Sequence, residues 1–133
     1  MSGRAGAARA LPTRLVEKVW GRTHLPANFS VPGEARIGEI WFEPPPEMLE
    51  ILVKYLFTSE KLSVQVHPSK DSAIAGEAAK EECWLVLDAE PGAKLAIGFR
   101  EEQSREDVLE AALDGSIEDL LVWHDVKAGE IFC

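Results

Sequence analysis

The stretch Leu62-Ser63-Val64-Gln65-Val66-His67, followed by Pro68, decides the fold. Apolar and polar residues alternate along it, which is the pattern of a strand with one face toward a core. Pro68 lacks the backbone N–H that a sheet needs, so the strand should end there. On such a strand Gln65 and His67 share one face, about 7 Å apart along the backbone.

Other short β-prone segments lie on both sides of this stretch. They are 37–42, 49–57, 83–87, 94–99 and, after a turn, 126–132. Pro44-Pro45-Pro46 and the segment 88–92 supply the turn chemistry between them. Many short strands with such turns predict a mainly β fold, an antiparallel jelly roll. The strands are fewer than the eight or so of a complete jelly roll, so we expect an incomplete one.

A small helical insert is predicted between the last two strands. Ser104 can cap a helix that Gly115 stops. The apolar stripe of this helix consists of Val108, Leu109, Ala112 and Leu113. A second short helix, capped by Ser116, is predicted over 116–122. The Ala-rich segment 71–80 is predicted to be either a third helix or a loop.

The charge and hydropathy of the chain exclude two classes of partner. The 133 residues carry a net charge of -9, and proteins that bind nucleic acid through phosphate contacts usually carry a basic stripe instead. No apolar run approaches the roughly 20 residues of a membrane-spanning helix. We therefore expect neither a nucleic acid nor a membrane as partner.

The beginning of the chain differs in composition from the rest. Residues 1–14 are rich in Ala and Arg, which favours a flexible tail, with an organellar targeting segment as the alternative. Residues 15–133 are expected to form a single domain. Cys83 and Cys133 do not form the pattern of a disulfide framework, so a reducing cytoplasm is the expected location.

Gln65, His67 and Glu82 could together bind a metal ion. Glu82 opens the predicted strand 83–87, and a carboxylate there could complete a Gln/His/Glu set for Zn²⁺ or a similar divalent ion. Each residue also has a simpler interpretation. A single histidine on a strand is commonly a hydrogen-bonded core or surface residue, and Glu82 could belong to a solvated charge cluster with Lys80 and Glu81.

Lys54 is the other residue that could take part in chemistry, because it interrupts an otherwise apolar strand. A lysine that faces inward is costly unless an anion pairs with it, and an anionic substrate would do so. Alternatively, Lys54 lies on an edge strand, where its stem packs and its ammonium reaches water.

Taken together, the chain from about residue 15 onward resembles the type I mannose-6-phosphate isomerases. The order and spacing of several short motifs carry this resemblance. They are Glu17-Lys-Val-Trp20-Gly21, Ile37-Gly38-Glu39-Ile40-Trp41, Leu52-Val-Lys54-Tyr-Leu-Phe57-Thr58, Leu62-Ser63-Val-Gln65-Val-His67-Pro68-Ser69, Glu82-Cys-Trp84, Asp88-Ala-Glu-Pro-Gly-Ala-Lys94 and Ala112-Leu-Asp-Gly-Ser-Ile-Glu-Asp-Leu-Leu121.

The resemblance implies a cupin fold of the jelly-roll type and one bound zinc ion. It implies that Gln65, His67 and Glu82 are zinc ligands. It places Lys54 and Lys80 in the active site as catalytic and substrate-binding residues, and Ser63 and Trp20 as substrate-binding residues. The implied activity interconverts mannose 6-phosphate and fructose 6-phosphate, so a hexose 6-phosphate is the expected partner and carbohydrate metabolism the expected role.

Members of this family continue beyond a segment like 126–132 to a further zinc-ligating histidine and an active-site arginine. We therefore expect this chain to correspond to an amino-terminal part with a weak zinc site, and its own activity is left open by the sequence. His24 and His124 are the candidates for a substitute ligand. An open sheet edge could be covered by a homodimer. The alternative function is a non-catalytic cupin module that binds a sugar phosphate or a partner chain.

Overall fold

The chain divides into two compact units, Met1–Ser63 and Val64–Cys133. A computed structural model describes residues 8–26, 28–67 and 80–133, and the units are described separately below. The structure is mainly β with antiparallel pairing and one α-helix, as the sequence predicts, and this is consistent with an incomplete cupin-type fold. The expectation of a single domain over residues 15–133 stays a prediction.

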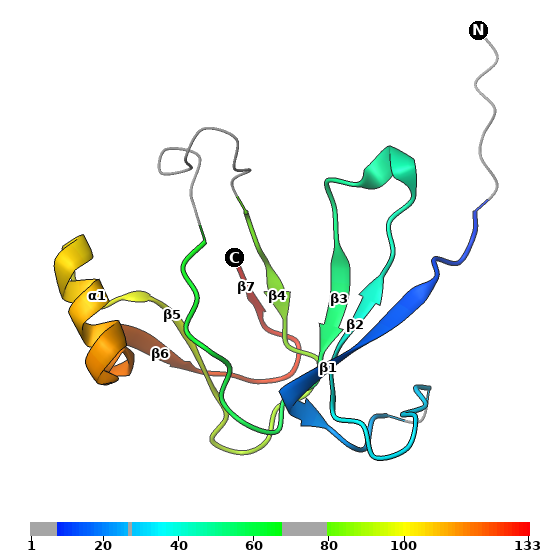
Figure 1. The fold of residues 1–133 in the computed structure, drawn as a ribbon, viewed down its shortest axis with the longest axis horizontal. Coiled ribbons are helices and arrows are strands. Elements are labelled where there is room, and N and C mark those ends of the chain that lie inside the picture. Colours follow the sequence, from blue (N-terminus) through cyan, green and yellow to red (C-terminus); the bar gives the residue numbers. More distant parts are fainter. Residues whose placement is uncertain (1–7, 27, 68–79) are drawn as a thin grey trace, which may run out of the picture. The chain divides into compact units, whose positions relative to one another are not determined.

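The first unit contains a three-stranded antiparallel sheet. Its strands are β1 (Thr13–Arg22), β2 (Ile37–Phe42) and β3 (Val53–Leu56), with β2 in the middle (Figure 1). The core of this sheet lies at β2, where Ile37 and Ile40 are each only 1% exposed. Strand β2 has the predicted bounds. Strand β1 was not predicted, and it begins two residues inside the segment expected to be a tail.

The predicted strand 49–57 is shorter than expected. Only Val53–Leu56 pairs with β2, with Val53 opposite Phe42, whereas Pro46–Met48 forms a 3-10 turn, η1. The N–H of Ile51 donates to the carbonyl of Met48, so the backbone before Val53 turns back on itself. The proline run favours this turn because Pro46 at its first position has a suitable fixed φ. Strand β3 starts at Val53, which pairs with Phe42, the last residue of β2.

Two glycines allow β1 and β2 to approach closely. A Cβ at Gly21 would lie 2.5 Å from the carbonyl carbon of Ile37, which is too close for any side chain. A Cβ at Gly38 would lie 2.7 Å from Cζ3 of Trp20. These contacts fit the bulge between Glu17 and Arg22, where the pairing register shifts. Trp20 thus lies against the backbone of β2.

The second unit contains two antiparallel pairs of strands with a helical segment between the members of one pair. Strand β4 (Trp84–Leu85) pairs with β7 (Ile131–Phe132), and β5 (Lys94–Phe99) pairs with β6 (Leu121–Asp125). Helix α1 (Arg105–Asp114) and the 3-10 turn η2 (Ser116–Leu120) connect β5 to β6 (Figure 1). None of the helices in the described ranges is long and apolar enough to span a membrane.

Helix α1 begins and ends as predicted. The Oγ of Ser104 accepts a hydrogen bond from the Asp107 N–H at 3.1 Å, and Gly115 ends the helix in the left-handed conformation at φ 87°. The predicted stripe is mostly exposed: Leu109 and Leu113 are 60% and 81% exposed, Ala112 is exposed as well, and Val108 is half-buried. The buried residue of this helix is Ala111, which is not part of the predicted stripe. The second predicted helix is a 3-10 turn that Gly115 precedes, and residues 121–122 already belong to β6.

Two further predictions for this unit are wrong. The segment 62–67 forms no strand, because alternation alone does not supply the neighbouring backbone that a strand must pair with. Cys83 and Cys133 form a disulfide. They face each other because Trp84 pairs with Phe132 and the adjacent positions continue that register. The predicted helix or loop at 71–80 lies outside the described residues, apart from Lys80.

Candidate functional site

Three of the predicted site residues meet in the second unit. The Nε2 of His67 lies 2.9 Å from Oε2 of Glu82. The Nζ of Lys80 lies 3.3 Å from the same carboxylate oxygen and 3.2 Å from Nε2 of His67. Lys80 and Glu82 precede β4, and His67 ends the segment 62–67. Lys80 and Glu82 follow His67 by 13 and 15 positions in the sequence, and the three side chains form one cluster, the His67–Lys80–Glu82 cluster.

This cluster offers two donor atoms that converge on one point. An imidazole nitrogen and a carboxylate oxygen are both ordinary zinc ligands, and two ligands of one zinc ion lie about 3 Å apart. The Lys80 ammonium contacts both atoms, so a positive charge already fits against them. In the described part of the chain, no group of three or more His, Cys, Asp or Glu side chains could hold a metal. The predicted set would therefore need Gln65 as its third ligand.

Gln65 and Ser63 lie on the exposed segment that leads to His67. Both have interactions within the protein. Their assignment as a zinc ligand and a substrate-binding residue stays a prediction. The two alternative histidines have contacts of their own: His24 contacts Thr23 at 3.0 Å, and the ring of His124 packs 5.8 Å from that of Phe132.

Lys54 lies in a second polar cluster, in the first unit. Its Nζ donates to Oε1 of Glu39 at 3.2 Å, and the indole Nε1 of Trp41 donates to Oε2 of Glu39 at 2.7 Å. Glu39 and Trp41 are two residues apart on β2 and so share a face, and Lys54 pairs with Trp41 across β2 and β3. We call these three residues the Glu39–Trp41–Lys54 cluster. Trp20, another predicted substrate-binding residue of this unit, packs against Gly38.

The Glu39 carboxylate is ionised in spite of its burial. Burial by itself raises the pKa of this carboxyl. The hydrogen bonds from Trp41 and Lys54 and the positive charges of Lys54 and Lys18 lower the pKa, and their combined effect is larger than that of burial. The net result is a pKa below the ordinary value of 4.5. The prediction that an anion pairs with Lys54 is thus met by a side chain of the protein itself.

Glu39 was not singled out from the sequence. The available signal was the same as for Lys54, namely a charged residue inside a short apolar strand, Ile37–Phe42. Two such charges of opposite sign on neighbouring strands suggest a pair. Without the register between the strands, their contact could not be predicted.

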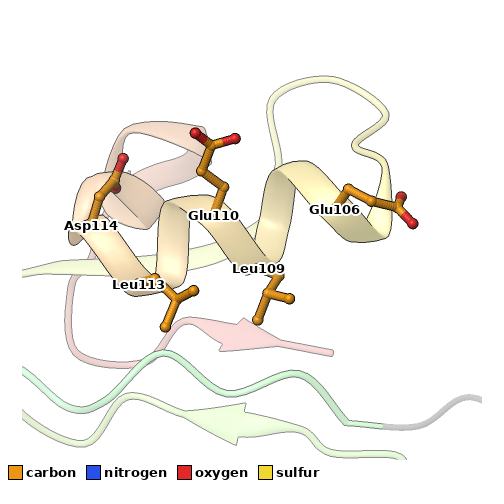
Figure 2. Close-up of a pocket in the computed structure, with 5 residues that line it drawn as sticks. All are labelled: Glu106, Leu109, Glu110, Leu113 and Asp114. Atoms are coloured by element: carbon orange, nitrogen blue, oxygen red, sulfur yellow. The ribbon is translucent and has the colours of Figure 1, made fainter.

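A pocket lies on helix α1, and none of the residues that line it belongs to either cluster. Its volume is about 400 Å³, and it is lined by Glu106, Leu109, Glu110, Leu113 and Asp114 (Figure 2). Figure 2 shows that Leu109 and Leu113 point to the same side of the helix. Three carboxylates around an apolar pair would repel a phosphate group, so this pocket is not a candidate sugar-phosphate site.

Comparison with known proteins gives a consistent set of relatives. The mannose-6-phosphate isomerase of Streptococcus mutans serotype c is 35% identical over 96 residues, which are 71% of this chain and 30% of that protein. "Probable mannose-6-phosphate isomerase GmuF" of Bacillus subtilis (strain 168) is 33% identical over 97 residues, with the same two shares. Mannose-6-phosphate isomerase ManA of the same organism is 33% identical over 85 residues, 62% of this chain and 27% of that protein.

Over this stretch, the chain is similar in sequence to the mannose-6-phosphate isomerases. It spans about 30% of the length of these relatives. No family profile matches the chain, and no solved structure matches it. The relationship to mannose-6-phosphate isomerases therefore rests on sequence identity, and the cupin assignment rests on the resemblance and on the mainly β structure.

Proposed function

We propose that the chain is part of a zinc-dependent mannose-6-phosphate isomerase, which interconverts mannose 6-phosphate and fructose 6-phosphate. The observation that carries this proposal is the convergence of His67, Lys80 and Glu82 in a chain related to proteins of that name. A relationship in sequence alone would not require these three side chains to meet. Their contact supports a site that uses an imidazole, a carboxylate and an ammonium together.

In this proposal Gln65, His67 and Glu82 would hold one zinc ion. The donor set fits zinc in kind, since it combines an imidazole nitrogen with carboxylate and amide oxygens. Gln65 is a neutral and weak ligand, so we expect loose binding by these three residues. When bound, zinc would polarise the substrate carbonyl and stabilise the negative charge that develops on its oxygen.

The reaction moves a proton between two adjacent carbons, and the side chains of this chain must position the substrate for that transfer. Lys80 lies beside the proposed ligands, where its ammonium can bind an oxygen of the sugar phosphate or share in proton transfer. Lys54 would neutralise the phosphate, and Ser63 and Trp20 would contact the substrate. We do not assign the group that removes the proton from carbon.

Zinc content tests the proposed site directly. Equilibrium dialysis of the chain against saturating zinc, which keeps a loosely bound ion in place, should give close to one zinc per chain. The His67→Ala variant should lose it. His124→Ala tests the candidate substitute ligand on β6, whose ring packs against that of Phe132. Zinc retained in this variant would show that the loss in His67→Ala is specific. Equal zinc in both variants, or none in the unsubstituted chain, would contradict the proposed site.

Turnover of mannose 6-phosphate is the second measurement. Because the chain spans about 30% of its relatives, the activity of those whole proteins is not assumed for it. Binding of zinc and mannose 6-phosphate without turnover would favour the alternative, a non-catalytic cupin module. A cytoplasmic location goes with the metabolic role proposed here. It no longer has the support of the cysteines, because Cys83 and Cys133 form a disulfide.

A further inference from the structure

The Glu39–Trp41–Lys54 cluster differs from a surface ion pair, because its carboxylate is buried and hydrogen-bonded at both oxygens. Glu39 is 6% exposed and lies on the central strand of its sheet. Each of its carboxylate oxygens has a donor of its own: Trp41 donates to Oε2 and Lys54 to Oε1. The carboxylate can therefore not rotate without losing a hydrogen bond that burial makes costly to lose.

Trp41 is itself held in place by Arg14, which lies on the neighbouring strand β1. The guanidinium carbon of Arg14 lies 4.5 Å from the centre of the Trp41 ring, and Arg14 also pairs with Glu43 at 3.4 Å. Arg14 and Trp41 are register partners on β1 and β2. All three strands of the first unit thus contribute to the position of one carboxylate.

The far end of this arrangement is the Lys54 ammonium. A lysine ammonium has three N–H donors, and the contact with Glu39 uses one of them. The Lys54 side chain is 22% exposed, so its tip reaches solvent while its stem is covered. A free lysine loses much rotamer freedom when it binds an anion, and a lysine that is already held loses less.

We infer that Glu39 is a positioning residue: it holds the Lys54 ammonium at a fixed place from which the remaining N–H groups bind the phosphate of a sugar phosphate. This inference rests on the function proposed above, since it takes Lys54 as a phosphate-binding residue. Glu39 does not contact the substrate in this arrangement. The ionised state of its carboxyl supports the inference, because only a carboxylate accepts hydrogen bonds at both oxygens and attracts the ammonium.

A double-mutant cycle on the full chain tests this inference. The dissociation constant of mannose 6-phosphate is measured by calorimetry for the unsubstituted chain, Glu39→Gln, Lys54→Gln and the double variant. We expect Glu39→Gln to weaken binding about tenfold, the scale of one charge-assisted hydrogen bond. In the Lys54→Gln background the same change should have no further effect, because a positioning residue acts only through the group it holds.

Two other variants separate positioning from general damage to the sheet. Glu17→Gln removes the same charge from an exposed position on β1 and should leave binding unchanged. Trp41→Phe removes the N–H donor to Glu39 while keeping an aromatic ring beside Arg14, and we expect a smaller loss of about threefold. It also serves if Glu39→Gln fails to fold, as circular dichroism would show.

Each outcome decides a different question. Binding by Glu39→Gln that equals the unsubstituted chain, or an equal loss in the Lys54→Gln background, overturns the inference and leaves the proposed function intact. Absence of mannose 6-phosphate binding in the unsubstituted chain overturns the proposed function, and the inference with it.

Discussion

At the residue scale, Glu39 and Lys54 illustrate how a sheet can hold opposite charges in its interior. Burying a lone carboxylate is costly, and two hydrogen bonds offset that cost here, one from the neutral indole of Trp41 and one from the positive ammonium of Lys54. Removing one partner would leave the other buried and unmatched. The pair therefore contributes to the specificity of the strand register as well as to the proposed phosphate site.

The lowered pKa of Glu39 makes a prediction about stability and pH. A carboxyl whose pKa is lower in the folded than in the unfolded chain contributes stability above its unfolded value, and this contribution is lost as the pH falls through the folded value. We expect the free energy of unfolding to decrease as the pH falls below 4.5, the ordinary value for glutamate. Urea unfolding measured from neutral pH downward tests this.

The matched variant for that measurement is Glu39→Gln, which cannot titrate. Its stability should change less over the same pH range, although it is lower at neutral pH, where the buried hydrogen bonds are weakened. Parallel pH profiles for the two proteins would show that other carboxyls account for the acid sensitivity. That result would remove Glu39 from the explanation.

The sequence predicted single residues better than their partners. Lys54, His67 and Glu82 could be selected because each is a polar side chain in or next to an apolar strand pattern, whereas Lys80 was selected through the family resemblance alone. The contact of Lys80 with His67 and Glu82 is consistent with the choice of these residues. The pairing of Lys54 with Glu39 was missed, because it depends on the register of β2 against β3, which no single strand encodes.

At the element scale, helix α1 shows which signals are local. Its first and last residues follow from Ser104 and Gly115, since a cap involves only neighbouring residues. Its buried side does not follow from its own sequence. Leu109 and Leu113 are exposed although they belong to the predicted stripe, because the surrounding elements decide which side of a helix is covered.

The same contrast explains the strands that were predicted wrongly. The segments 49–52 and 62–67 alternate like strands, yet the structure assigns no strand to either. Strand β1 was not predicted, and it forms because β2 pairs with it along most of its length. A strand is a property of two segments, and the pattern describes only one.

Two substitutions at the end of helix α1 should differ in their effect on stability, one at Gly115 and one at Leu113. Gly115 has φ 87° and open space around its Cα, so Gly115→Ala should cost about 1 kcal/mol through backbone strain alone. Leu113→Ala at the 81% exposed position should change stability by less than about 0.5 kcal/mol. Urea unfolding of both variants measures this. A cost of several kcal/mol for Leu113→Ala would show that this leucine is packed.

At the scale of the whole molecule, little apolar surface is buried in either unit. In the described residues only Ile37, Ile40, Ala111 and Leu121 form fully buried apolar positions. Larger apolar side chains such as Val19 and Leu49 are exposed. Since apolar burial is the main stabilising term in folding, other links between distant segments gain importance for this chain.

The Cys83–Cys133 disulfide is such a link, and it closes a loop with a sequence separation of 50 residues. Closing a loop of this length lowers the entropy of the unfolded chain and should stabilise the fold by about 4 kcal/mol.

We expect a thiol reagent to detect no free thiol in the denatured, unreduced chain. Reductant should lower the urea midpoint markedly. The Cys83→Ser/Cys133→Ser variant should unfold like the reduced chain and should not respond to reductant. Two free thiols in the unreduced chain would contradict this link, and the reducing environment inferred from the two cysteines would again be tenable.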